Sequence, residues 1–539
     1  MAQSLAAATP PLELRTVVSA LIFPARPYAS KPYRVLLFRR SEKVRTYQRK
    51  LAPIAGSVEA DDQNPLAAAW REIKEETGFG PQQLELWRRG AGFEFTDEKA
   101  VSGQNGGNSK GRIWKVWPFA FRLKGTLADQ DSDVSKLGLS LDWEHLGCEW
   151  KDVSDILDRK ILDDCVPRLE ITLGQLWVDP GSVLHQGLEE LRLDHQHGAR
   201  ELATMAIRSM VKIVEHDRQA QPPRNIQQWW QSFQQQAFHL AFNGRPSMGA
   251  AICGAVATAL KDAKGCIDAE GQNPLDRIKM SLEVYLMRRK QISKQVSDQF
   301  STFLQERFKA TQTGPAETKS VKILTLSSSS TIKAAILHAL DADESLSLEL
   351  RILESRPLNE GASFAKALTQ EAQRRREYQS SGPCFHDRLR IILASDASVA
   401  ILSKNVDFVV MGADRISEAG DVSNKTGSLA AALVSKFVTN GSVDVVCISE
   451  SEKIAVPGTA EENQEEDNDE DELASTWHVE GSAAWKEMVT VRNVYFEWCP
   501  VRYVDHYICE DGVLSTQDIR QRSSHTLKLI EEVFPSEHV

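Results

Sequence analysis

Three carboxylates at helical spacing are the clearest chemical feature of the sequence. Glu72, Glu75 and Glu76 lie in the segment NPLAAAWREIKEETG, residues 64–78. Residues three and four positions apart in a helix share a face, so each like-charged pair costs about 0.2–0.5 kcal/mol. The partial negative charge at the end of a helix adds to that cost. We therefore expect a cation to compensate this face.

The same segment has the start and stop signals of a helix. Asn64 can cap its first turn, Pro65 suits the first position, and Gly78 can take the left-handed conformation at the end. A hard divalent ion such as Mg²⁺ or Mn²⁺ would bind the carboxylates and the phosphate groups of a substrate. This favours hydrolysis of a phosphoanhydride, although three glutamates alone are equally typical of an exposed acidic face.

A longer pattern around this helix resembles the box of the Nudix hydrolases. Gly56 is followed after five residues by Asp62, and after eight more by the run REIKEETGF, residues 71–79. The family's box has glycine, glutamate and then arginine-glutamate-apolar-x-glutamate-glutamate-x-glycine-apolar. This chain departs from it by Asp62 in place of glutamate and by one extra residue before Arg71. The resemblance covers about residues 12–165.

The resemblance implies a Nudix diphosphohydrolase that uses Mg²⁺ or Mn²⁺. By family analogy Glu72, Glu75 and Glu76 bind the metal, and one of them or a metal-bound hydroxide activates the attacking water. Arg71 would orient a glutamate. The box does not name the substrate. Aromatic residues on nearby predicted strands could stack on a base, although such residues more often belong to the core. They are Phe93, Phe95 and Trp114.

A second group of polar residues follows strand-like segments in the carboxy-terminal half. Asp414 lies in a Gly-Ala-Asp turn directly after an apolar strand, where open α/β sheets gather ligands. Arg356 could clamp a phosphate, and Asn424 and Lys425 would add a donor and a charge at the start of a helix. A sugar phosphate is the expected ligand. Taken alone, Asp414 and Arg415 more often form turn-stabilising pairs.

Fragments of this half resemble the family of methylthioribose-1-phosphate isomerase, ribose-1,5-bisphosphate isomerase and the alpha, beta and delta regulatory subunits of translation initiation factor 2B. The fragments keep the family's order from about residue 184 to 530. They are HGARELATMAI (197–207), GRPSMGAAI (244–252), ESRPLNEG (354–361), VDFVVMGADRISEAGDVSNKTGSLAAAL (406–433) and NVYFEWCPVRYVDHYICEDGVL (493–514).

Isomerases of this family are associated with a cysteine and the GADR aspartate as an acid–base pair. Asp414 keeps the aspartate, but Ser327 takes the place of the cysteine in ILTLSSSS, residues 323–330. A serine hydroxyl is a far poorer proton carrier than a thiol, whose reference pKa is about 8.5. This loss resembles the initiation-factor subunits and predicts that the domain binds a sugar phosphate, with help from Ser327, without isomerising it.

The elements that must position these groups form three predicted regions in a multi-domain α/β fold. Residues 1–165 mix β-rich runs with one helix, as in the Nudix α/β/α sandwich that the resemblance implies. Residues 184–310 have a helical period and form a helical subdomain. Over residues 320–535, Val/Ile/Leu-rich strands alternate with helices, which is typical of a Rossmann-like parallel sheet. The acidic run at residues 461–472 is predicted to be a disordered insert.

Composition narrows the classes of function. The 539 residues carry a formal net charge of -11, most of it in the acidic run, so a large nucleic-acid footprint is not expected. Eight cysteines without a CxxC pair argue against a disulfide framework or zinc ribbon and favour the cytoplasm. The first residues do not resemble a signal peptide, and no apolar stretch reaches the roughly 18 residues of a membrane span.

These observations predict an enzyme: a Nudix diphosphohydrolase of nucleoside diphosphate derivatives fused to an initiation-factor-2B-like domain that binds a sugar phosphate or nucleotide. One alternative makes the second half an active aldose–ketose isomerase, as in methionine salvage. Another makes the chain a regulatory or assembly protein with a translation-factor partner. The family resemblance also implies a homodimer through the carboxy-terminal domain.

Overall fold

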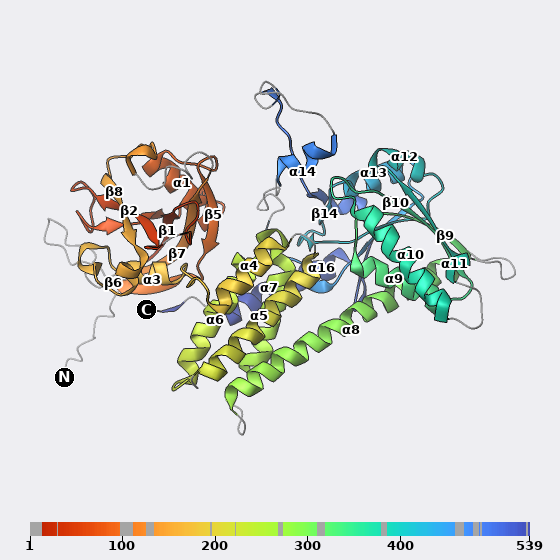
Figure 1. Ribbon diagram of the computed structural model, residues 1–539, viewed down its shortest axis with the longest axis horizontal. Helices are drawn as coiled ribbons and strands as arrows, with labels where there is room; N and C mark the ends of the chain where they lie inside the picture. Colours follow the sequence, from red (N-terminus) through yellow and green to blue (C-terminus); the bar gives the residue numbers. More distant parts are fainter. Residues whose placement is uncertain are drawn as a thin grey trace, which may run out of the picture. The chain divides into compact units, whose positions relative to one another are not determined.

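The computed structural model divides into two compact units, each with its own sheet (Figure 1). The first unit comprises Met1–Arg192, Pro223–Gly244 and Glu532–Val539, and the second comprises Leu193–Pro222 and Arg245–Glu531. The structure describes residues 13–29, 31–97, 112–124, 134–194, 197–220, 223–267, 273–309, 319–378, 385–458, 468–477, 485, 488–534 and 537–538.

One mixed sheet forms the centre of the first unit. Its strands are β1 (Glu13–Phe23), β2 (Arg34–Arg40), β3 (Leu51–Ala52), β4 (Ile54–Ser57), β5 (Leu84–Arg89), β6 (Phe93–Asp97), β7 (Arg112–Leu123), β8 (His145–Asp152) and β19 (Glu537–His538). Within the described residues the order is β19-β6-β7-β1-β2-β3, and β4, β5 and β8 pair with β1, β7 and β2. The long parallel pairing of β1 with β7 holds the sheet together.

Helices cover both faces of this sheet. On one face α1 (Pro65–Thr77) buries Ala69 and Ile73 against strand residues such as Phe121. On the other, α2 (Val153–Leu157) and α3 (Leu169–Gly174) pack against residues that include Phe23 and Leu37. The α/β/α sandwich predicted from the sequence is therefore confirmed, and it fixes α1 against β4.

The helices of residues 184–310 are divided between the two units. α4 (Val183–Leu193) lies almost entirely in the first unit, as does α6 (Ile226–Asn243). The side chain of Asn243 joins α6 to β5. Its amide oxygen accepts from the backbone N–H of Arg89, and its amide nitrogen donates to the backbone carbonyl of Arg89, each at 2.9 Å. α5 (Ala199–Ala220), α7 (Gly249–Lys264) and α8 (Pro274–Lys309) belong to the second unit and pack together.

A Rossmann-like sheet forms the centre of the second unit, as predicted. Its strands are β9 (Lys319–Leu326), β10 (Leu346–Leu353), β11 (Leu389–Ala394), β12 (Phe408–Met411), β15 (Asp444–Ile448), β17 (His506–Cys509) and β18 (Gly512–Leu514). Their order is β11-β10-β9-β12-β15-β17-β18, and every pair is parallel except β17 with β18. The order reverses beside β9, which places a topological switch point between the carboxyl ends of β9 and β12.

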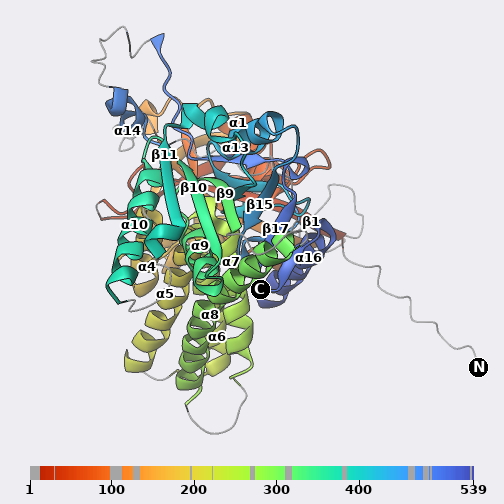
Figure 2. The ribbon, with the colours of Figure 1, turned by 90° about the vertical axis from the view of Figure 1, so that its right-hand side faces the viewer.

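Helices also cover both faces of the second sheet. Figure 2 shows α9 (Ser330–Ala342) and α10 (Glu360–Tyr378) over one face, where they share a core with α8. α12 (Val399–Leu402), α13 (Ser428–Val438) and α16 (Thr516–Val533) pack on the other face. A small sheet of β13 (Arg415–Ile416), β14 (Val422–Lys425) and β16 (Phe496–Cys499) lies beyond β12. In the described part of the chain, no helix is long and apolar enough to cross a membrane.

The carboxyl end of the acidic run is structured, so the disorder predicted for residues 461–472 is wrong for residues 468–472. Asp469 caps the short helix α14 (Glu470–Ala474). Glu472 accepts hydrogen bonds from Asn493 Nδ2 at 3.0 Å and from the hydroxyl of Tyr495. Hydrogen bonds to an ionised carboxylate are stronger than those between neutral groups, so they can order an acidic segment whose composition predicts disorder. The preceding residues 461–467 lie outside the described residues.

Candidate functional site

The carboxylate helix of the first unit begins and ends where its sequence predicts. Asn64 Oδ1 accepts from the N–H of Ala67 at 3.0 Å, and Pro65 is the first helical residue. Gly78 has a φ of 74° and donates its N–H to the carbonyl of Lys74 at 3.0 Å. These caps fix the helix, so that its glutamates fall in the last two turns.

Arg71 connects the helix to the loop before it. Its Nε and Nη2 donate to the two carboxylate oxygens of Asp62 at 3.2 and 2.9 Å. Its Nη1 donates to Glu72 Oε1 at 2.8 Å and to Glu75 Oε2 at 3.3 Å. The hydrogen bonds from Arg71 hold the pKa of Asp62 below its usual range. Asp62 thus serves, at the position where the family has glutamate, as the anchor of the arginine.

Glu72 lies half-buried beside the strand that carries Gly56. A Cβ atom built on Gly56 would overlap the Glu72 carboxylate, so a side chain at this position would displace that carboxylate from its place beside β4. Burial raises the pKa of Glu72 to about 7, even though Arg71 opposes the rise. Glu75, by contrast, has a side chain that is 58% exposed. The helix therefore presents one carboxylate that is poorly solvated and one in solvent.

Glu76 is turned into the interior of the unit. Only 4% of its surface is exposed, and its carboxylate contacts Nε2 of the buried His145 at the start of β8. Burial raises the pKa of Glu76, against the opposing effect of His145. Glu75 and Glu76 both still repel the Glu72 carboxylate, but Glu76 has a buried imidazole as its partner, whereas Glu75 lies in solvent.

The structure leaves the metal site as a prediction. Among the described residues, no three His, Cys, Asp or Glu side chains gather closely enough to hold a metal ion. His145 is the site residue that sequence reasoning missed, since a lone histidine far from the helix in sequence gives no signal. The Nδ1 atom of His145 has no hydrogen-bond partner among the described residues.

The aromatic residues near the box belong to the sheet. Phe93 is fully buried and stacks on Phe95, with ring centroids 6.2 Å apart. Phe95 pairs with Trp114 across β6 and β7. For Phe93 this confirms the core interpretation over contact with a base.

The second candidate site lies at the switch point of the second unit. Ser327 directly follows β9, with a φ of 63° and a side chain that is almost completely buried. Its N–H donates to Ser355 Oγ at 2.7 Å, and its hydroxyl donates to Glu360 Oε2 at 3.1 Å. The other oxygen of Glu360 pairs with Lys425 Nζ at 3.2 Å. Glu360, which sequence reasoning missed, thus joins two of the predicted site residues.

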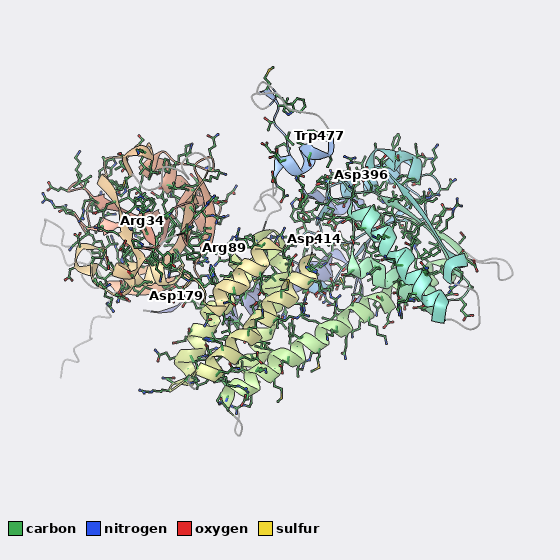
Figure 3. All side chains as sticks on the ribbon, in the orientation of Figure 1. Arg34, Arg89, Asp179, Asp396, Asp414 and Trp477 are labelled. Atoms are coloured by element: carbon green, nitrogen blue, oxygen red, sulfur yellow. The ribbon has the colours of Figure 1, made fainter. Side chains whose placement is uncertain are left out.

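Asp414 lies at the same edge, after β12 (Figure 3). Its N–H donates to the carbonyl of Ser423 at 2.9 Å, and its carboxyl group accepts from the N–H of Ala199 at the start of α5. Burial raises the pKa of Asp414, against the attraction of Lys453 and Lys425. The switch point therefore holds a carboxyl group that resists ionisation.

A buried network of charges lies behind Asp414. Lys453 Nζ donates to the carbonyl of Ala413 at 2.8 Å and pairs with Glu450 at 3.3 Å. Burial would lower the pKa of Lys453, but Glu450 and Asp414 outweigh burial and raise it. Thr331 donates to Glu450 Oε1 at 2.8 Å. Neither Lys453 nor Glu450 was predicted, because both follow β15, whose place beside β12 only the sheet reveals.

The residues predicted to bind phosphate are brought together only in part. Lys425 Nζ lies 4.9 and 4.5 Å from the ring centroids of Tyr495 and Phe496. Asn424 Nδ2 donates to Ser428 Oγ at 2.9 Å, which holds the start of α13. Lys425 and Ser327 therefore share the switch point through Glu360, whereas Asn424 has a structural partner.

Arg356 makes contacts of a different kind. Its side chain is 47% exposed and lies 3.4 Å from Glu354. Its Nη1 donates to Thr476 Oγ1 at 3.0 Å, next to α14. Its backbone N–H donates to Asp396 at 2.9 Å and fixes the turn after β10. The role of Arg356 as a phosphate clamp stays a prediction.

Cys447 is a described thiol close to the Gly-Ala-Asp turn. Its Sγ lies 4.0 Å from the carbonyl of Gly412, and its side chain is fully buried on β15. Burial raises the pKa of Cys447 to about 12. A thiol with that pKa is a poor substitute for the cysteine that Ser327 replaces.

Comparisons with known proteins match one domain in each half of the chain. Residues 14–167 match the NUDIX domain, and residues 382–516 match the Initiation factor 2 subunit family. The chain joins a NUDIX domain to an initiation factor 2 subunit domain. Both resemblances expected from the sequence are thereby confirmed.

The curated relatives match a short part of the chain. The methylthioribose-1-phosphate isomerase of Xylella fastidiosa (strain 9a5c) is 30% identical over 142 residues, which is 25% of this chain and 37% of that protein. The isomerase of the same name from Citrifermentans bemidjiense is 30% identical over 135 residues, 24% of this chain and 36% of that protein. The chain thus spans little more than a third of the length of these relatives.

Solved structures similar to the chain include two from Pyrococcus horikoshii OT3. The translation initiation factor eIF-2B is 19% identical, with a TM-score of 0.44, over 62% of this chain and 98% of that chain. The 5-methylthioribose 1-phosphate isomerase is 17% identical, with a TM-score of 0.44, over 67% of this chain and 90% of that chain.

Proposed function

We propose that the first unit is a metal-dependent diphosphohydrolase of nucleoside diphosphate derivatives. The observation that carries this proposal is the arrangement of Glu72, pressed against Gly56 and held by Arg71. Arg71 fixes the carboxylate of Glu72 in one orientation, and His145 fixes that of Glu76. Glu75, on the solvent side, has a hydrogen bond from Arg71 at 3.3 Å, which it would exchange for a bound ion.

The residues of this helix fit a magnesium ion. Mg²⁺ keeps several waters and is commonly bound by only one or two protein carboxylates together with substrate phosphates. Glu72 supplies a hard oxygen donor whose charge is poorly solvated, and Glu75 and Glu76 lie in the adjacent turn. When bound, such an ion would neutralise phosphate charge and supply an activated water.

A substrate screen tests this proposal. The purified chain should release a nucleoside monophosphate from members of a nucleotide-sugar and dinucleotide panel in the presence of Mg²⁺, and EDTA should abolish the release. Equal release in Mg²⁺ and in EDTA would contradict it.

For the second unit, we propose binding of a sugar phosphate or nucleotide without isomerisation. Lys425 would supply the positive charge that attracts the phosphate, and Glu360 orients Lys425. Ser327 donates its hydroxyl to Glu360, and Cys447 has too high a pKa to act in place of the missing cysteine. On this proposal the site binds a phosphate, and a serine hydroxyl stands in the place of the thiol proton carrier.

A second candidate function is aldose–ketose isomerisation, which the names of the curated relatives favour. The raised pKa of Asp414 suits a general acid, so that one half of the acid–base pair is retained. Incubation with methylthioribose 1-phosphate distinguishes the two functions by whether a ketose forms.

We also propose a homodimer through the second unit and a cytoplasmic location. A translation-factor partner is the alternative to an enzyme acting alone.

A further inference from the structure

A cavity of about 700 Å³ with several charged lining residues lies on the second unit, and its lining includes none of the residues described at the switch point. It is lined by residues of α8, α9 and α10, and Figures 1 and 2 show α9 between the other two helices. Buried residues of the same helices, such as Phe300, Ile336 and Leu368, face the sheet. The cavity therefore belongs to the solvent side of this helical layer.

The cavity has a surplus of positive charge. Its charged lining residues other than histidine are Lys290, Lys294, Lys333, Arg374, Arg375, Asp341 and Glu371. The arginines already hold both acids. Arg374 pairs with Glu371 at 2.7 Å, and Arg375 pairs with Glu371 at 2.9 Å and also with Asp341. These hydrogen bonds lower the pKa of Glu371 to about 2, so that its charge stays committed to the arginines.

The three lysines carry the surplus. Lys290 and Lys294 lie one turn apart on α8, where like charges repel, and Lys333 reaches the same cavity from the first turn of α9. Within the described ranges, no ion pair involves any of these lysines. Ser293 and Gln370 add polar groups to the lining. An anion is the partner that this arrangement lacks.

We propose that this cavity binds a small soluble anion carrying several phosphate groups. Lysine binds phosphate as a point charge, and three lysines on two helices can each meet a different phosphate of one ligand. The cavity volume falls within the roughly 300–1,000 Å³ typical of small-molecule sites. Binding of a nucleic acid would need an extended basic surface, whereas here the basic residues converge on one hollow.

Calorimetric titration of the full chain with inorganic tripolyphosphate, in EDTA, tests the proposal. We expect tripolyphosphate to bind, with an affinity that falls as the salt concentration rises. The triple variant Lys290→Gln/Lys294→Gln/Lys333→Gln should lower that affinity at least about tenfold. The matched variant Lys264→Gln/Lys366→Gln/Lys404→Gln removes the same charge from lysines outside the cavity and should keep the affinity within about twofold. Lys425→Met should also leave it unchanged.

Four results would overturn the proposal. The first is no binding of tripolyphosphate up to about 1 mM, a ligand concentration at which even weak sites fill. The second is equal loss in both triple variants, and the third is loss in Lys425→Met alone, which would place the anion at the switch point. The fourth is binding only of phosphoinositide vesicles or of a single-stranded RNA, which would assign the lysines to a membrane surface or a nucleic acid.

Discussion

The two candidate sites of this chain are built in opposite ways. The first is local: Gly56, Asp62, Arg71 and Glu72 lie within the end of β4, the loop that follows it and one helix. The second is assembled at a switch point from segments that are distant in sequence, and the charges behind it, Glu450 and Lys453, are buried. A local site can be recognised as a motif, whereas an assembled one is recognised only once the strands are ordered.

Charge is also compensated differently at the two sites. At the first, Arg71 serves three carboxylates, so that the helix still carries an excess of negative charge for a cation. At the second, Lys453 faces Glu450 and Asp414 inside the unit, and Lys425 pairs with Glu360. The first site therefore suits the metal ion that we propose, and the second depends on its internal pairs for stability.

The largest expected effect is on the buried pairs. Lys453→Met should lower the free energy of unfolding of the second unit by about 3–5 kcal/mol, because it removes the nearer of the two cations that pair with the buried Glu450 and leaves only Arg200, at 3.7 Å. Denaturant unfolding of the full chain measures this loss, with the exposed Lys404→Met as the matched control. A loss below about 1 kcal/mol, as for an exposed ion pair, would show that the buried pairs of the second site do not stabilise its unit.

Acid should destabilise the first unit through the buried His239 of α6, which lies outside both candidate sites. Burial, aided by Arg88, lowers the pKa of His239 to about 3, so that folding excludes a proton that the unfolded chain binds below about pH 6.5. The stability is present above pH 6.5 and is lost as the pH falls toward 3, by roughly 2 kcal/mol at pH 5. Unfolding of His239→Gln should lack this part of the pH dependence; an identical pH profile would refute the assignment.

Activity at the first site should be lost without a loss of folding. Glu72→Gln should reduce Mg²⁺-dependent phosphate release at least about tenfold, because the amide binds a cation weakly. The free energy of unfolding should change by less than about 1 kcal/mol, since repulsion from the other glutamates is relieved. The exposed Glu59→Gln is the control and should keep full activity. Full activity of Glu72→Gln would remove this carboxylate from the mechanism.

Ligand binding at the second site should depend on Lys425 more than on Arg356. Ribose 1-phosphate should raise the melting temperature of the unmodified chain. Lys425→Met should raise the ligand concentration needed for the same shift about tenfold, because the positive charge that pairs with Glu360 is lost. Arg356→Ala should have the smaller effect, since its guanidinium donates to Thr476. The reverse order would restore Arg356 as the phosphate clamp.

How much the sequence reveals follows from the same contrast. The caps of α1, the α/β/α sandwich and the Rossmann-like sheet follow from periodicity, turn residues and family motifs. The contact of Glu76 with His145 does not, because it depends on where β8 lies in the sheet. Glu360 and Lys453 are ordinary charged residues until β10 and β15 bring them near Asp414. The short helix after Asp469 was missed because its hydrogen bonds come from residues beyond Arg492.

The central claim is that the second site binds a sugar phosphate that it does not convert. Phosphorus NMR of methylthioribose 1-phosphate with the unmodified chain tests this claim directly. The account predicts that the phosphate resonance shifts or broadens on binding and that no ketose phosphate forms over many hours. Formation of ketose phosphate by the unmodified chain, and its disappearance with Asp414→Asn, would contradict the account and show an active isomerase.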